Sequence, residues 1–219
     1  LTGTIPKEEF SAVAIEAVLG PVLGRLTAKE LQDRGIIANL HINIWQLQDY
    51  GNLFTSYAAE LSWLTSDRRR LTYLANEFKT ISENGNTLIL VDRIKTGQLL
   101  QSLIPDSVFI HGNVKSADRK SEYKEISTVD NKVIIATYGV ASTGINIVRV
   151  YNLILIEPGK SFIRVIQSIG RGIRVADDKD FVNVYDITSN CKYSKNHLGK
   201  RKKFYEETQY PYTIAKVVY

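Results

Sequence analysis

The sequence predicts an α/β fold in which a mostly parallel β-sheet is flanked by helices. Short runs rich in Val and Ile recur between polar stretches with helical periodicity, which is the pattern of strands alternating with crossover helices. These runs are almost continuously hydrophobic, so we expect both faces of the strands to be buried, as they are in parallel sheets. In such a sheet, ligand-binding residues gather in the loops beyond the carboxyl ends of the strands.

The first 36 residues are predicted to differ from the rest of the chain. A turn (LTGTIP, 1–6) precedes a helix over 7–20, and the stretch 21–35 contains glycines and a proline that break regular structure. We expect 1–36 to be the end of a preceding domain plus a linker, and 37–219 to be one domain. Its strands are expected over 40–47, 86–91, 107–112, 132–138, 153–157, 181–187 and 213–219. Its helices are expected near 54–83, 93–104, 116–127, 161–174 and 195–209.

The composition narrows the class of protein. The 219 residues are 44% hydrophobic and 23% charged, as in a folded soluble protein, and no apolar run approaches the length of a membrane span. A cytoplasmic location is therefore expected. The single Cys191 and three scattered histidines lack the spacing of metal ligands, so no metal site is expected. The net charge of +5 is a modest indication of a polyanionic partner, and the absence of methionine indicates a fragment of a longer protein.

The segment EPGKSF (157–162) raises the question of a phosphate-binding loop. Gly159, Lys160 and Ser161 match the second half of the pattern G-x-x-x-x-G-K-[ST]. The first glycine would have to stand at 154, where Ile154 lies inside a predicted strand, and a β-branched residue cannot replace it. We interpret the segment as a turn between a strand and a helix.

Three other segments could carry chemistry. In VIIATYGVASTGINI (133–147), a strand is followed by small residues, which we expect to form a loop that suits close approach by phosphate oxygens, although such residues also permit tight helix packing. In QSIGRGIRV (167–175), the spacing of Gln167, Arg171 and Arg174 places them on one helix face, where two arginines could hold a triphosphate. The alternative for that face is a solvated basic surface. The basic run 192–203 could equally contact nucleic-acid phosphates or be solvated.

The order of the motifs is more specific than any one of them. LTGTIP, TLILVDRIKTG, VFIHG with a downstream arginine, ATYGVASTGINI and QSIGRGIR follow one another in that order. In this order the chain resembles the C-terminal half of a superfamily 2 helicase or translocase, through motifs III, IV, IVa, V and VI. Within that superfamily it is most similar to the UvsW-type DNA helicases of tailed phages and their relatives near RecG and the type III restriction translocases.

The resemblance implies a motor of two RecA-like domains that bind ATP and Mg²⁺ between them and DNA, single-stranded or branched, across both. The first domain holds the phosphate-binding loop and the acidic Mg²⁺ motif, so this chain alone is expected to be inactive. By match to motif VI, Arg171, Arg174 and Gln167 would act on the γ-phosphate. By match to motifs III and V, the residues near the nucleotide would be Gly3, Thr4, Gly144 and Asn146. By match to motifs IV, IVa and V and from the basic run, the nucleic-acid contacts would be Arg93, Gly112, Arg119, Thr137, Lys200 and Arg201.

Two departures from the family pattern limit this transfer of roles. Asn146 stands where motif V often has an aspartate that contacts the ribose, and the spacing from Thr137 to Gly144 is one residue longer than in DEAD-box proteins. Recombination, repair or replication-fork processing would be the cellular setting. A nucleic-acid-binding or strand-annealing module without its own hydrolysis is the alternative function, and a small-molecule kinase built around GKS is a weaker one.

Overall fold

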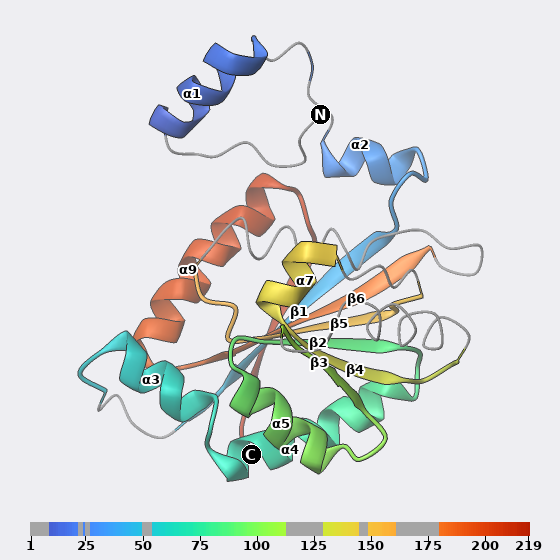
Figure 1. The fold of residues 1–219 in the computed structure, drawn as a ribbon, viewed down its shortest axis with the longest axis vertical. Helices are drawn as coiled ribbons and strands as arrows, with labels where there is room; N and C mark the ends of the chain where they lie inside the picture. The colour runs from blue at the N-terminus through green and yellow to red at the C-terminus, as the bar shows by residue number, and fades with distance from the viewer. Residues whose placement is uncertain are drawn as a thin grey trace.

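A seven-stranded sheet forms the centre of the molecule (Figure 1). The computed structural model describes residues 9–21, 24, 27–49, 54–112, 129–144, 149–160 and 180–219. All six strand pairs are parallel, and the strand order is β3-β4-β2-β5-β6-β1-β7. The strands are β1 (Asn39–Leu47), β2 (Thr87–Val91), β3 (Val108–Ile110), β4 (Val133–Thr137), β5 (Asn152–Ile156), β6 (Phe181–Ser189) and β7 (Tyr212–Val217). The predicted α/β fold with a parallel sheet is confirmed.

Helices cover both faces of the sheet and complete two hydrophobic cores. On one face, α4 (Arg68–Ser82) and α5 (Ile94–Leu103) pack on β2, β4 and β5. On the other face, α7 (Tyr138–Gly144) and α9 (Lys192–Glu207) pack on the same sheet. The helix α3 (Tyr57–Leu64) lies at the carboxyl edge of the sheet beside the start of α9 (Figure 1).

The alternating burial of β1 fixes its register in the sheet. Leu40, Ile42 and Ile44 belong to the core beneath α7 and α9. Leu47, on the opposite face, belongs to the core beneath α4 and α5, where Trp45 packs beside it. A slip of one residue would move each of these side chains to the wrong core, so the hydrophobic pattern specifies the pairing with β6 and β7.

The structure differs from three sequence-based expectations. The predicted helix 54–83 is two helices, because Asp67 begins a new one by accepting a hydrogen bond from the Arg70 amide at 2.8 Å. The irregular stretch 21–35 contains α2 (Ala28–Asp33), whose N-terminus is closed by a reciprocal capping box between Thr27 and Glu30. The residues after β4 form the short helix α7 and not a loop. The predicted helices 116–127 and 161–174 lie outside the described residues.

The helix α1 (Glu9–Leu19) stands apart from the sheet (Figure 1). Three of its apolar side chains are exposed, Val13 at 59%, Val18 at 82% and Leu19 at 75%. Over the described ranges, no helix is both long and apolar enough to cross a bilayer. The same ranges contain no group of three or more His, Cys, Asp or Glu side chains placed to hold a metal ion.

Candidate functional site

Three predicted nucleic-acid contacts meet at one end of the carboxyl edge of the sheet. Gly112 follows β3, Thr137 ends β4, and Arg93 follows β2, and these three strands are adjacent in the order β3-β4-β2. Neighbouring strands lie about 4.8 Å apart, so the three positions fall within a span of roughly 10 Å. Gly112 has open space where a side chain would be, and Arg93 Nη1 donates to Ser62 Oγ at 3.1 Å.

The helix α7 begins directly after Thr137 and carries the small residues of the predicted loop. Tyr138 is buried, and its hydroxyl donates to the Ile156 carbonyl at 3.3 Å, which ties the start of α7 to the end of β5. Gly139 is exposed, and a Cβ there would meet no atom within 4 Å. Gly144, one of the predicted nucleotide contacts, is the last residue of this helix.

The remaining predicted site residues lie outside the described part of the chain. They are Gly3, Thr4, Arg119, Asn146, Gln167, Arg171 and Arg174. Their roles at the nucleotide and on the nucleic acid therefore stay predictions.

Gly159 and Lys160 form a turn after β5, as the sequence predicts, and Ser161 lies outside the described residues. Ile154 lies within β5, and Gly159 in the following turn has a φ of +73°, a left-handed conformation that favours glycine. The Gly159 carbonyl accepts a hydrogen bond from Arg201 Nη1 at 2.6 Å. The turn is thus fixed from α9 at the point where the chain leaves β5 toward residues 161–174.

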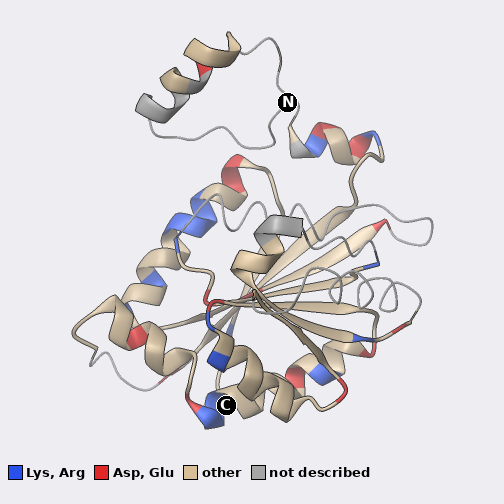
Figure 2. Ribbon diagram, in the orientation of Figure 1, with Lys and Arg blue, Asp and Glu red and all other residues tan. Residues whose placement is uncertain are grey.

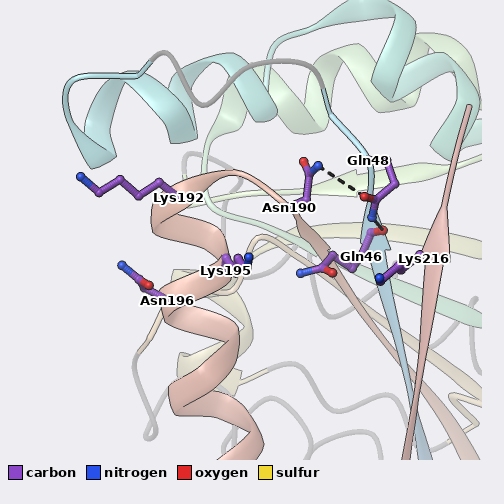
Figure 3. A pocket seen from close by; sticks show the side chains of 7 residues that line it. All are labelled: Gln46, Gln48, Asn190, Lys192, Lys195, Asn196 and Lys216. Atoms are coloured by element: carbon purple, nitrogen blue, oxygen red, sulfur yellow. Dashed lines mark hydrogen bonds between the residues drawn. The ribbon is translucent and has the colours of Figure 1, made fainter.

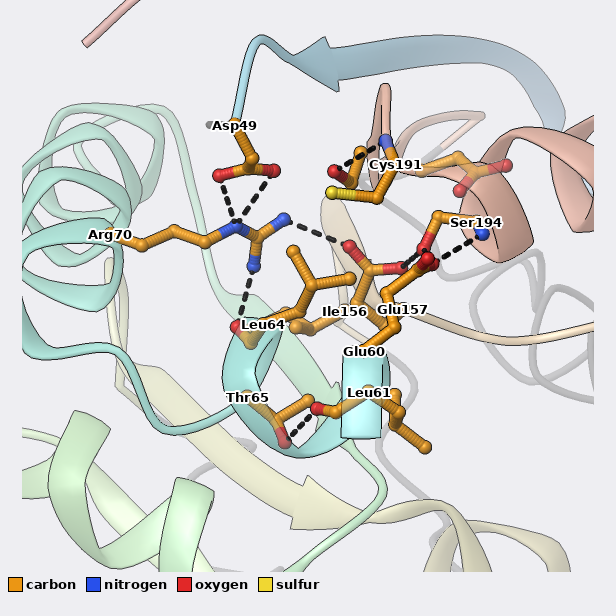
Figure 4. Close-up of polar contacts among 12 residues, drawn as sticks. Asp49, Glu60, Leu61, Leu64, Thr65, Arg70, Ile156, Glu157, Cys191 and Ser194 are labelled. Carbon is orange, nitrogen blue, oxygen red and sulfur yellow. Dashed lines mark hydrogen bonds and ion pairs between the residues drawn. The ribbon is translucent and has the colours of Figure 1, made fainter. Parts of the chain in front are cut away.

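A buried ion network lies immediately beneath this turn (Figure 4). The Arg70 guanidinium is fully buried, and its Nη2 donates to Glu157 Oε1 at 2.8 Å while its Nε donates to Asp49 Oδ1 at 3.2 Å. Its Nη1 donates to the Leu64 carbonyl at 2.9 Å. One arginine therefore links the segments that follow β1 and β5 to the end of α3. Its own buried charge is paired with two carboxylates.

A second carboxylate, Glu60, closes the N-terminus of α9. The N-cap residue Cys191 makes no side-chain cap, and Glu60 accepts hydrogen bonds instead from the amides of Tyr193 at 3.0 Å and Ser194 at 2.7 Å. An anion is favourable there because the first amides of a helix lack intrahelical acceptors and carry the positive end of the helix dipole. This contact fastens α3 to α9.

The Ser194 hydroxyl lies between two carboxylates, 2.9 Å from Glu60 Oε1 and 3.0 Å from Glu157 Oε2. It has one hydrogen, so both contacts become hydrogen bonds only when one carboxyl group brings a proton. Burial raises the pKa of Glu157 to about 7, against the opposing effect of the Arg70 and Arg201 charges. Glu157 can therefore carry this proton at pH values up to about 7.

The prediction that Arg201 faces nucleic acid is wrong. Its side chain is 1% exposed and forms a paired contact with Asp186, from Nε to Oδ2 at 2.8 Å and from Nη2 to Oδ1 at 2.9 Å. The Tyr205 hydroxyl donates to the same carboxylate at 3.0 Å, and burial raises the pKa of Tyr205. Lys200 is exposed, and Figure 2 shows that Lys and Arg residues recur along α9.

The sequence reasoning missed these buried networks. Asp49, Glu60, Arg70 and Glu157 lie in separate elements or loops of the chain and come together only in the folded protein. The one available indication was Asp186, a carboxylate inside the apolar strand FVNVYDI, because a buried charge of this kind needs a cationic partner.

The class of protein follows from this fold together with the comparisons. Residues 69–176 match the family described as the helicase conserved C-terminal domain. The resemblance to the C-terminal domain of a superfamily 2 helicase is thereby confirmed.

Two viral proteins are similar to this chain in sequence. The chain is 23% identical over 215 residues to the ATP-dependent DNA helicase uvsW of Enterobacteria phage T4, a match that covers 93% of this chain and 43% of that protein. The transcript termination protein A18 of Fowlpox virus is 21% identical over 78% of this chain and 38% of its own length. The chain thus spans less than half the length of these relatives.

Solved structures share the fold. The crystal structure of T4 UvsW superposes with a TM-score of 0.72 at 22% identity, covering 83% of this chain and 42% of that one. A fragment of a putative type I restriction HsdR subunit from Vibrio vulnificus gives 0.70 at 16% identity, covering 94% of this chain and 41% of that one.

Proposed function

We propose that this chain is the C-terminal motor domain of an ATP-dependent DNA helicase or translocase. The observation that carries the proposal is the match to the phage T4 DNA helicase along 93% of the chain, joined to the match of residues 69–176 to the helicase C-terminal family. The arrangement of Arg93, Gly112 and Thr137 at neighbouring strand ends supports it, because a nucleic-acid backbone can run along such an edge.

ATP is the second proposed ligand, and it is held chiefly by a first RecA-like domain that also binds Mg²⁺. From this chain, Gly144, Asn146, Gly3 and Thr4 lie near the nucleotide, and Gln167 belongs to the network around the γ-phosphate. Arg171 and Arg174 stabilise the charge that develops as the γ-phosphate leaves. Residues 1–36 are the end of that first domain and its linker, and the exposed apolar side chains of α1 support this assignment.

The buried networks give the proposed domain a rigid base for this chemistry. Glu157, Arg70 and Arg201 hold the turn that leads from β5 to the segment containing Gln167, Arg171 and Arg174. A misplacement of about 1 Å costs roughly a hundredfold in rate when catalytic groups act by position, so the anchoring of this turn matters for function. The proposed cellular role is processing of branched DNA in recombination, repair or replication.

The test is steady-state ATP hydrolysis with and without single-stranded or branched DNA. The 219-residue chain alone is expected to hydrolyse no ATP, while a protein that joins it to the first RecA-like domain shows hydrolysis that DNA stimulates. Robust DNA-stimulated hydrolysis by the chain alone would refute the division of the active site. Absence of hydrolysis in the joined protein, with DNA binding retained, would favour the binding or annealing module.

A further inference from the structure

A pocket lined by lysine and amide side chains opens near the β1 and β7 end of the carboxyl edge. Its volume is about 640 Å³, and its lining comes from β1 and β7, from the segment after β6 and from the first turns of α9 (Figure 3). Three lysines line it, Lys192, Lys195 and Lys216, and the other lining residues are amides. Among the residues that the structure describes, no carboxylate lines it, so the lining residues carry a formal charge of +3.

The lysine charges have no carboxylate partner within 4 Å in the described ranges of the chain. The acidic residues near them in the fold are already engaged, since Glu60 accepts the amides of α9 and Asp49 pairs with Arg70. Like charges gathered in one hollow repel one another, and an anion removes that repulsion. An anion is therefore the ligand that this lining suits.

Amide side chains form an ordered wall on the strand side of the pocket. Gln48 Nε2 donates to the Gln46 carbonyl at 2.9 Å, and Asn190 Nδ2 donates to Gln48 Oε1 at 3.4 Å. Gln46 and Lys216 are register partners on neighbouring strands and share one face of the sheet. Each of these amide nitrogens has a second hydrogen, so the wall can offer amide hydrogens beside ammonium groups, a donor set that binds phosphate oxygens.

We propose that this pocket binds backbone phosphates of a nucleic-acid strand, as a second contact separate from the edge at Arg93, Gly112 and Thr137. The strands β2 and β1 are three steps apart in the sheet, about 14 Å at the usual spacing. One phosphate cannot occupy both places, but one strand several nucleotides long reaches both. The anion binding does not depend on the ATP-hydrolysing residues.

The experiment compares two double variants of the 219-residue chain with equal loss of charge. Lys195→Gln with Lys216→Gln alters the pocket, whereas Lys79→Gln with Lys132→Gln removes two lysines near the amino ends of the strands. Binding of a labelled single strand is followed by fluorescence anisotropy over a series of salt concentrations. Thermal melting of each variant checks that it is folded, and Lys195→Arg with Lys216→Arg supplies a charge-conserving version.

The pocket variant is expected to bind several-fold more weakly, with the slope of log K against log salt reduced by about 1.4, or about 0.7 for each lost phosphate contact. The control pair should change the slope much less, and the arginine version should restore it. Equal losses in both double variants would overturn the proposal. Inorganic phosphate that binds the chain while excess single strand fails to displace it would also overturn it, in favour of a free anion. ATP hydrolysis is not measured, so the proposed motor function can fail without affecting this result.

Discussion

Replacing Glu157 by Gln should remove a pH dependence from the stability of this domain. Glutamine resembles the protonated carboxyl group, so it can accept from Arg70 and donate to Ser194, which then donates to Glu60. The Glu157→Gln variant should therefore keep the buried hydrogen bonds but have no titrating group at position 157.

The magnitude follows from the pKa of Glu157, which burial raises from 4.5 to about 7. Between these two values the folded protein holds a proton that the unfolded chain has released, so stability falls as pH rises. The contribution is fully present below 4.5 and is lost as pH rises through 7. At 1.36 kcal/mol for each pKa unit, the wild-type protein should lose about 3 kcal/mol of unfolding free energy across this window.

Urea denaturation followed by circular dichroism at several pH values measures this loss. Glu157→Gln should make the unfolding free energy less dependent on pH by about that amount. Glu83→Gln, at the exposed C-terminus of α4, is the matched control and should leave the wild-type dependence unchanged. Parallel pH profiles for wild type and Glu157→Gln would refute the assignment of the proton to Glu157.

Three further variants test two neighbouring parts of the account. Arg201→Gln should lower the unfolding free energy by about 3 kcal/mol, because it leaves the Asp186 carboxylate buried without its cation, whereas Lys200→Gln should change it by less than about 0.5 kcal/mol. Urea denaturation at neutral pH measures the unfolding free energy of both variants. Equal, small changes in the two variants would contradict the burial of Arg201 beside Asp186. Lys160→Ala, in a protein that includes the first RecA-like domain, should leave ATP affinity largely intact in equilibrium binding, because Lys160 lies in a turn and not in a phosphate loop. A large loss of affinity would revive the kinase-like interpretation.

The sheet could be predicted because its signal is local. Runs such as TLILV and NLILI are buried along their whole length, and continuous hydrophobicity identifies a central parallel strand. Two helices were harder to predict for the same local reason. Tyr138–Gly144 contains two glycines, a serine and a threonine, which have low helical propensity, and Asp67 restarts a helix within a stretch of helical periodicity.

The sequence predicted the positions of candidate site residues only where they belong to a recognisable motif. Arg93, Gly112 and Thr137 could be assigned because each follows a recognisable strand, and strand order then places them together. Arg201 was misassigned because its neighbours Lys200 and Lys202 make it look like part of a solvated basic run. Its environment is set by Asp186 across a helix–sheet contact, which is tertiary information that spacing alone does not contain.

The basic residues of α9 lie in two different environments. Arg201 faces the sheet and fixes the turn at Gly159, while Lys192 and Lys195 border the pocket and Lys200 faces solvent. The same helix therefore holds the turn that precedes the proposed catalytic segment and carries the lysines on which the proposed phosphate contact depends.

Arg174 offers the most direct test of the proposed motor function. In a protein that joins this chain to the first RecA-like domain, Arg174→Ala should retain ATP and DNA binding while DNA-stimulated hydrolysis falls by roughly 10³ or more, the scale of an arginine finger. Arg174→Lys should not restore the rate, because a point charge lacks the planar guanidinium that spans two phosphate oxygens. The measurement is steady-state ATP hydrolysis beside equilibrium nucleotide binding, with Lys160→Ala as the control. A near-normal rate of hydrolysis in Arg174→Ala would contradict the account and favour a solvated basic surface for the segment that contains Arg171 and Arg174.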